Sequence, residues 1–138
     1  MLEKIDHIGI AVFDMDEALK KYERLFGIKA RHIEEREGVS TRIAFIQVGE
    51  SMIELLAPVA PSNMGISQFL KKNGEGISHI AYRVENLSAL LSEMKQAGVK
   101  LRDQSPRPGG AGARIAFIDP VETGNVLTEL VEREKELA

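Results

Sequence analysis

The sequence predicts an α+β protein built from two copies of one βαβββ module. The first observation is a repeat at an offset of 72 residues, at which IDHIGIAV (5–12) aligns with ISHIAYRV (77–84). The second is the pentapeptide RIAFI, which occurs at 42–46 and again at 114–118, at the same offset. The third is a helix-periodic segment after each first strand. Self-similarity at a fixed offset is typical of a duplicated structural unit.

The repeat also predicts how the chain is divided. We expect module one at about 1–60, a connector at about 61–76 and module two at about 77–133. A chain of 138 residues is close to the commonest size of one domain. We therefore expect a single domain over 1–138, in which the two modules pair through a curved mixed sheet.

The first module reads as a strand, a helix and three further strands. The helix begins after Asp14, which forms a capping pair with Glu17, and it ends at Gly27. Three runs of apolar residues within 28–58 then predict a three-stranded meander. The predicted buried face of the helix has the three- and four-residue spacing of one helical stripe, and its members are Ala18, Leu19, Tyr22, Leu25 and Phe26.

The second module follows the same pattern. Its helix begins after Asn86 and ends at Gly98, and its strands lie within about 99–133. The connector contains a short helix at about 64–72, which Gly74 closes. The predicted buried face of the second helix comprises Leu87, Leu90, Leu91 and Met94.

Composition excludes several classes of function. The 18 basic and 21 acidic residues give a net charge of −3, and no basic run exceeds two residues, so we expect no nucleic-acid partner. The absence of cysteine excludes disulfides, thiolate metal sites and a cysteine nucleophile. Neither a signal peptide nor a long apolar segment is recognisable, so we expect a cytoplasmic protein with no membrane partner.

Four polar residues occupy equivalent places in the two modules. His7 aligns with His79, and Glu54 aligns with Glu129 at an offset of 75, because the second module has three extra residues in the turn 119–125. Strand alternation places His7 on the face opposite the helix. A lone carboxylate in an apolar strand is costly to bury. Symmetric pairs favour a shared site over four unrelated packed or solvent-facing side chains.

Two imidazoles and two carboxylates can converge if the modules pack around a pseudo-twofold axis. Such a set suits one divalent ion of Zn, Co, Ni, Mn or Fe, and it leaves two positions open for a substrate with adjacent oxygens. We thus predict that the sheet encloses a metal site. His32 has no repeat partner and is interpreted as a surface residue, and Arg83 as part of a surface ion pair.

Together these segments resemble the vicinal-oxygen-chelate superfamily, which includes glyoxalase I, methylmalonyl-CoA epimerases, extradiol dioxygenases and fosfomycin-resistance proteins. Within it, nearly the whole chain is most similar to the methylmalonyl-CoA epimerases. The most specific segments are FLKKNGEGISHIAYRV and RIAFIDPVETGNVLTEL. Glyoxalase I tends to have a DPDGY-like turn where this chain has DPVETGN, which favours the epimerase.

The resemblance implies a metal-dependent isomerase that acts on an acyl-CoA, and it implies a homodimer. His7, His79 and Glu129 would be metal ligands, with Glu54 as the fourth. The metal would chelate the thioester carbonyl and carboxylate of methylmalonyl-CoA and stabilise an enolate during a 1,1-proton transfer. Glu129 would be one proton-transfer group.

The second proton-transfer group departs from the epimerase pattern. Counting from Gly38 places Thr41 where that pattern has a glutamate, and Thr41 is a poor base. Glu37 would serve if the hairpin register shifts. Two alternatives therefore stay open: a glyoxalase-I-like lyase that acts on a thiol hemithioacetal with the same four ligands, and a small-molecule binding or resistance protein.

Overall fold

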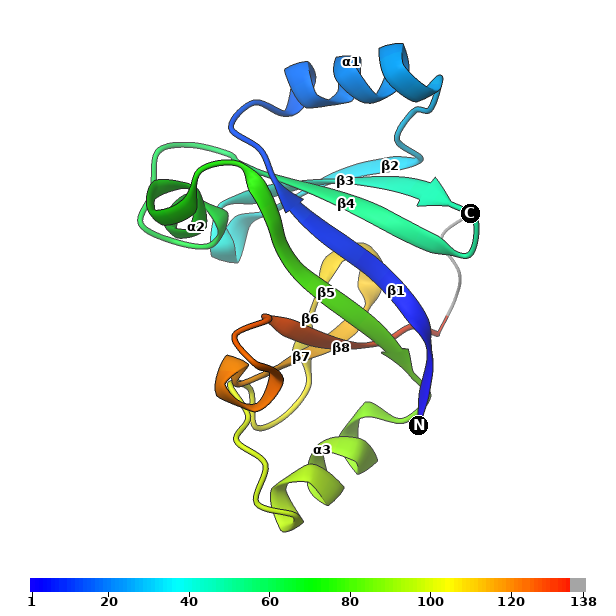
Figure 1. The fold of residues 1–138 in the computed structure, drawn as a ribbon, viewed down its shortest axis with the longest axis vertical. Coiled ribbons are helices and arrows are strands. Elements are labelled where there is room, and N and C mark those ends of the chain that lie inside the picture. Colours follow the sequence, from blue (N-terminus) through cyan, green and yellow to red (C-terminus); the bar gives the residue numbers. More distant parts are fainter. Residues whose placement is uncertain (135–138) are drawn as a thin grey trace. The chain divides into compact units, whose positions relative to one another are not determined.

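The computed structural model describes residues 1–134, with the exception of the side chain of Glu37 (Figure 1). Its element order repeats β-α-β-β-β, with a helix between the two copies, which confirms the predicted α+β class. The α helices and strands run in the order β1 (Leu2–Ala11), α1 (Met15–Phe26), β2 (His32–Arg36), β3 (Thr41–Val48), β4 (Ser51–Pro58), α2 (Ile66–Asn73), β5 (Gly76–Val84), α3 (Leu87–Gln96), β6 (Arg107–Pro108), β7 (Arg114–Ile118) and β8 (Thr128–Glu132).

The contacts of the chain define two compact units. Unit 1 contains residues 1–7 and the described chain from 79 onward, and unit 2 contains residues 8–78. The boundaries fall inside β1 and β5, directly beside the two repeated histidines. None of the described helices is long and apolar enough to cross a membrane.

Unit 2 contains the predicted meander. Strands β2, β3 and β4 pair in order with antiparallel neighbours, and β1 is the next neighbour of β4. Helix α1 covers this sheet through Met15 and Ala18, which join an apolar cluster with residues of β3 and β4. Asp14 caps the helix by accepting a hydrogen bond from the Glu17 amide at 3.0 Å. Gly27 ends it in the left-handed conformation, as predicted.

The last turn of α1 differs from the prediction. Ala18, Leu19 and Tyr22 pack against the apolar cluster, but Leu25 and Phe26 are 59% and 69% exposed. The ring of Phe26 contacts that of Tyr22 instead, with 5.7 Å between the ring centroids. The packed stripe therefore ends at Tyr22, and periodicity alone extended it one turn too far.

Unit 1 contains the mixed part of the sheet. Strand β5 pairs with β8 in parallel, whereas β8 with β7 and β7 with β6 are antiparallel. Helix α3 packs its predicted face against these strands, with Leu87, Leu90 and Leu91 buried and Met94 partly buried. The Asn86 side chain caps this helix by accepting a hydrogen bond from the Ala89 amide at 3.1 Å.

The two RIAFI strands have the same register with their partners. In β3 and β4, Phe45 pairs with Glu54, and in β7 and β8, Phe117 pairs with Glu129. Residues directly opposite each other on paired strands point to the same face of a sheet. The alignment of Glu54 with Glu129, inferred from the sequence repeat, is therefore confirmed as a structural equivalence.

Candidate metal centre

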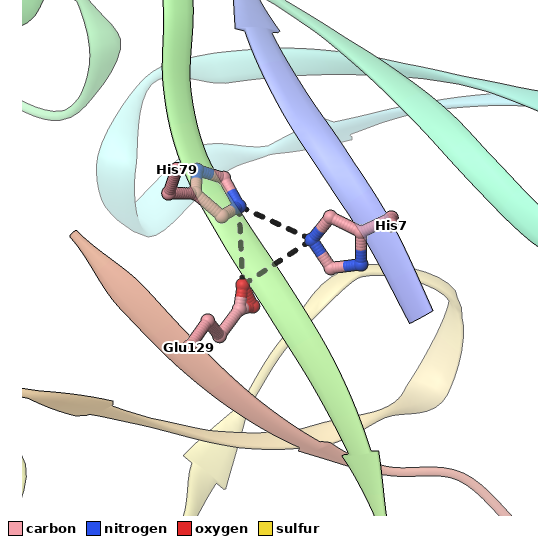
Figure 2. Close-up of side chains that lie close together, drawn as sticks. All are labelled: His7, His79 and Glu129. Atoms are coloured by element: carbon pink, nitrogen blue, oxygen red, sulfur yellow. Dashed lines mark hydrogen bonds and ion pairs between the residues drawn. The ribbon is translucent and has the colours of Figure 1, made fainter. Parts of the chain in front are cut away.

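Three of the four predicted ligands meet in unit 1. Figure 2 shows His7 from β1, His79 from β5 and Glu129 from β8 pointing toward one another. The two Nε2 atoms lie 3.1 Å apart, and Glu129 Oε1 lies 3.4 Å from that of His7 and 3.3 Å from that of His79. All three side chains are buried. The imidazole planes are nearly perpendicular, at 89°.

Strand register explains this convergence. Ala81 pairs with Glu129 across the parallel strands, and Ala81 shares a strand face with His79, two residues earlier. The small side chain of Ala81 is fully buried. On the other side, Phe117 pairs with Glu129, and its ring forms a T-shaped pair with that of His79, with 5.7 Å between the ring centroids. The sheet thus fixes both the spacing and the direction of the ligand atoms.

The carboxyl group of Glu129 is ionised at neutral pH. Burial by itself raises its pKa, but the charge and hydrogen bonding of His7 and His79 outweigh burial, so that the pKa lies below its ordinary value. Glu129 therefore places an anionic oxygen beside two imidazole nitrogens, and all three atoms could coordinate a metal ion.

The geometry fits one divalent cation. Metal–nitrogen and metal–oxygen bonds of about 2.1 Å place neighbouring ligand atoms roughly 3.0 to 3.4 Å apart in octahedral or tetrahedral coordination. The three observed separations, 3.1, 3.4 and 3.3 Å, fall in this range. Two imidazoles and a carboxylate suit Zn, Co, Ni, Mn or Fe(II). The residues present therefore match the cation that the sequence predicts.

The other predicted site residues lie in unit 2. Glu54 is buried on β4, at 5% exposure, in an apolar strand. Thr41 is also buried, and its hydroxyl proton is engaged in a hydrogen bond to the Val39 carbonyl at 3.0 Å. Glu37 lies in a 3₁₀ turn, but its side chain is outside the described part of the chain. The interpretation of His32 as a surface residue is confirmed, since it is exposed and bonds Glu34 at 2.8 Å.

A buried charged network beside His7 was not foreseen. The Asp6 carboxylate lies 2.6 Å from His7 Nδ1 and accepts hydrogen bonds from Arg83 at 2.7 Å and from Arg133 at 3.1 and 3.0 Å. The interpretation of Arg83 as a surface residue is wrong, because it is only 7% exposed. Strand β5 carries Arg83 to Asp6 inside unit 1, which periodicity could not reveal.

The network also fixes the charge of Asp6. Burial raises its pKa, but the hydrogen bond with His7 and the hydrogen bonds and charge of Arg133 hold the pKa far below its ordinary value. Asp6 is therefore a carboxylate, and a carboxylate only accepts hydrogen bonds. The proton in the short contact must belong to His7 Nδ1.

Unit 2 has a cavity of a different chemical character. Its volume is about 350 Å³, and it is lined mainly by apolar residues such as Phe13, Pro58 and Leu70. Ser67 contributes a buried hydroxyl with no hydrogen-bond partner among the described residues, and the Lys71 amine donates to Asn63 at 2.6 Å. Among residues 1–134, leaving aside the side chain of Glu37, no carboxylate or imidazole lines it. The candidate metal ligands His7, His79 and Glu129 are not among its lining residues.

Comparison with known proteins identifies the family of the chain. The family model of the glyoxalase/bleomycin resistance protein/dioxygenase superfamily matches residues 6–117. An ethylmalonyl-CoA/methylmalonyl-CoA epimerase of Cereibacter sphaeroides is 31% identical, over 94% of this chain and 98% of the relative. The uncharacterised protein YqjC of Bacillus subtilis is 40% identical, over 95% of this chain and 93% of the relative.

A solved structure extends the likeness to the whole fold. A methylmalonyl-CoA epimerase in complex with methylmalonyl-CoA and NH4+ superimposes with a TM-score of 0.91 at 34% identity, over 97% of this chain and 96% of that one. Epimerases are isomerases. The chain therefore belongs to the glyoxalase/bleomycin resistance protein/dioxygenase superfamily and, within it, to the methylmalonyl-CoA epimerase family of isomerases.

Proposed function

We propose that this protein epimerises methylmalonyl-CoA by a 1,1-proton transfer that depends on a bound divalent metal ion. The observation that carries the proposal is the convergence of His7 Nε2, His79 Nε2 and Glu129 Oε1 within 3.4 Å of one another in a buried position. The relatives and solved structures named for methylmalonyl-CoA support the choice of substrate.

Four residues would hold the cation. His7 and His79 supply neutral nitrogens, and Glu129 supplies an anionic oxygen. We assign Glu54 as the fourth ligand because it occupies in β4 the register position that Glu129 occupies in β8. A cation bound there would supply Lewis-acid stabilisation of the negative charge that develops on the thioester oxygen.

We assign Glu129 to one of the two proton transfers. Its carboxylate is ionised and buried, so it can accept the α-proton in a site from which bulk water is excluded. Oε1 faces the two histidines, and we assign Oε2 to the reacting carbon. The second group, which returns a proton to the opposite face, we place in the segment of Glu37 and Thr41. Glu37 is the better candidate there, because the Thr41 hydroxyl is bonded to a backbone carbonyl.

The test is isotope exchange by the purified, metal-loaded protein. Incubation with methylmalonyl-CoA in D2O should place one deuterium on the α-carbon, as measured by mass spectrometry of the acyl-CoA. A chelator should stop the exchange, and added Co²⁺ or Zn²⁺ should restore it. Consumption of methylglyoxal with glutathione, without any deuterium incorporation, would establish the lyase instead. Tight ligand binding without turnover would establish a binding protein.

We also propose the assembly and location that the sequence predicts: one domain per chain, paired as a homodimer in the cytoplasm. Light scattering on the eluting protein should give twice the chain mass of 15.2 kDa. A mass of one chain would contradict the dimer.

A further inference from the structure

Three of the differences between the two modules lie together in unit 1, and each places a charged residue where the other module has an uncharged one. At the offset of 72, Asp6 aligns with Ser78, and Arg83 aligns with Ala11. At the offset of 75, Arg133 aligns with Pro58. Each charged residue thus stands where the other module has an uncharged one.

These three residues bind one another. Arg83 Nε donates to Asp6 Oδ1 at 2.7 Å, and Arg133 donates to both oxygens of Asp6, at 3.1 and 3.0 Å. A further nitrogen of Arg133 donates to the Gly110 carbonyl at 3.1 Å. The side chains of Asp6, Arg83 and Arg133 are 0%, 9% and 3% exposed. The departures from the repeat therefore form one buried network.

Stability is a poor explanation for such a network. Removing charges from water costs several kcal/mol for each ion, and a buried ion pair of this kind is often no more stable than apolar residues of similar volume. The network has another consequence, because its carboxylate is directly bonded to His7 at 2.6 Å.

We propose that Asp6 is a positioning residue that fixes His7 as a metal ligand, and that Arg83 and Arg133 hold Asp6 in place. The carboxylate accepts the Nδ1–H of His7, which selects the tautomer whose Nε2 carries a lone pair. That Nε2 is the atom 3.1 Å from His79 and 3.4 Å from Glu129. A carboxylate behind a metal-bound histidine orients the ring and raises its basicity. The inference rests on the proposed function, because it assigns a purpose to His7 as a ligand.

The experiment compares Asp6→Asn with Ser78→Ala, which changes the residue before the other histidine. Metal-free protein is titrated with Co²⁺, and both the dissociation constant and the visible spectrum are recorded. We expect Asp6→Asn to weaken Co²⁺ binding by about 10- to 100-fold and to alter the spectrum. Ser78→Ala should bind Co²⁺ within threefold of the wild type. Equal weakening by both variants, or wild-type affinity in Asp6→Asn, would overturn the proposal.

A second readout does not need the metal. Nitrogen-15 and proton spectra of the metal-free wild type should show a proton on His7 Nδ1 that is held in a strong hydrogen bond, and Asp6→Asn should lose this signal. If the wild type binds no metal, the proposed metal site fails, while the Nδ1–H signal still decides the role of Asp6: an unchanged signal in Asp6→Asn overturns that role. If Asp6→Asn does not fold, Arg133→Gln replaces it. Arg133→Gln should bind Co²⁺ more weakly than the wild type does. Wild-type affinity in this variant would contradict the proposed role of the network.

Discussion

Strands β1 and β5 each place one histidine beside Glu129, but the residues that contact the two histidines differ. His7 and His79 approach Glu129 Oε1 at nearly equal distances, 3.4 and 3.3 Å. Behind His7 lies the charged Asp6 carboxylate, whereas the ring of His79 packs against that of Phe117 in a T-shaped arrangement. The repeat has kept the candidate ligands and the register of their strands. The surroundings have diverged, so equivalent histidines in the two modules do not require equivalent neighbours.

The most direct way to break this comparison is to remove each histidine. His7→Ala and His79→Ala should each abolish stoichiometric binding of metal, because both Nε2 atoms belong to the same cluster. Metal content by mass spectrometry and circular dichroism of the same samples separate lost binding from lost folding. Full metal occupancy in either folded variant would show that only one histidine is a ligand.

The aligned glutamates allow a second comparison. Glu129→Gln should reduce epimerisation by about 10²- to 10⁴-fold, because it removes a proton-transfer group. Glu54→Gln keeps an oxygen ligand and should retain most of the activity, and Thr41→Ala should lose less than Glu129→Gln. Rates are measured as deuterium incorporation with metal-saturated protein. An inactive Thr41→Ala beside an active Glu129→Gln would reverse the assignment.

The third comparison uses pH and the metal-free protein. Asp6 has a pKa below that of the unfolded chain, so its contribution to stability is fully present above about pH 4 and is lost as the pH falls toward its folded pKa. We expect the free energy of unfolding to fall between pH 5 and pH 2, with a share on the order of 2 kcal/mol from this group. Urea unfolding at several pH values measures it. Asp6→Asn should flatten the dependence, whereas Ser78→Ala should leave it unchanged.

The smallest expected effect on the free energy of unfolding concerns the N-caps of α1 and α3, which have the same hydrogen bond in both modules. Asp14 and Asn86 each accept a hydrogen bond from the amide three residues later, at 3.0 and 3.1 Å. Asp14→Ala and Asn86→Ala should each cost about 1 kcal/mol of unfolding free energy, without affecting metal binding. A loss confined to one variant would show that the helices do not contribute equally.

Much of this molecule could be predicted because the sequence contains the repeat. Periodicity and capping residues predicted α1 and α3, and the offset of 75 correctly aligned Glu54 with Glu129 before their pairing with Phe45 and Phe117 was known. Convergence of the two histidines with Glu129 followed from the same symmetry. The roles of these residues in binding metal stay predictions.

The network around Asp6 could not be predicted in the same way, because its members have no partners in the repeat. Asp6 and Arg83 are 77 positions apart, and Asp6 and Arg133 are 127 apart. A signal was nevertheless present: Asp6 stands between the apolar Ile5 and the candidate ligand His7 in a segment predicted to be a strand. A charge in such a position needs a partner of opposite sign. The repeat itself does not single out this position, because other aligned positions, such as Asp16 with Ser88 and Lys20 with Ser92, are also charged in one module only.

The duplicated strand RIAFI also has a consequence for folding. Strands β3 and β7 are identical over five residues, and each pairs antiparallel with the closing strand of its own module. Before the chain has reached its native topology, either copy satisfies the backbone of either closing strand equally well. Correct pairing must therefore be enforced by the less similar neighbours, such as the short β6 and the longer β2. The same sequence identity that reveals the duplication thus gives the chain a competing set of strand pairings, within one molecule or between two, of the kind that slows folding or exchanges strands between chains.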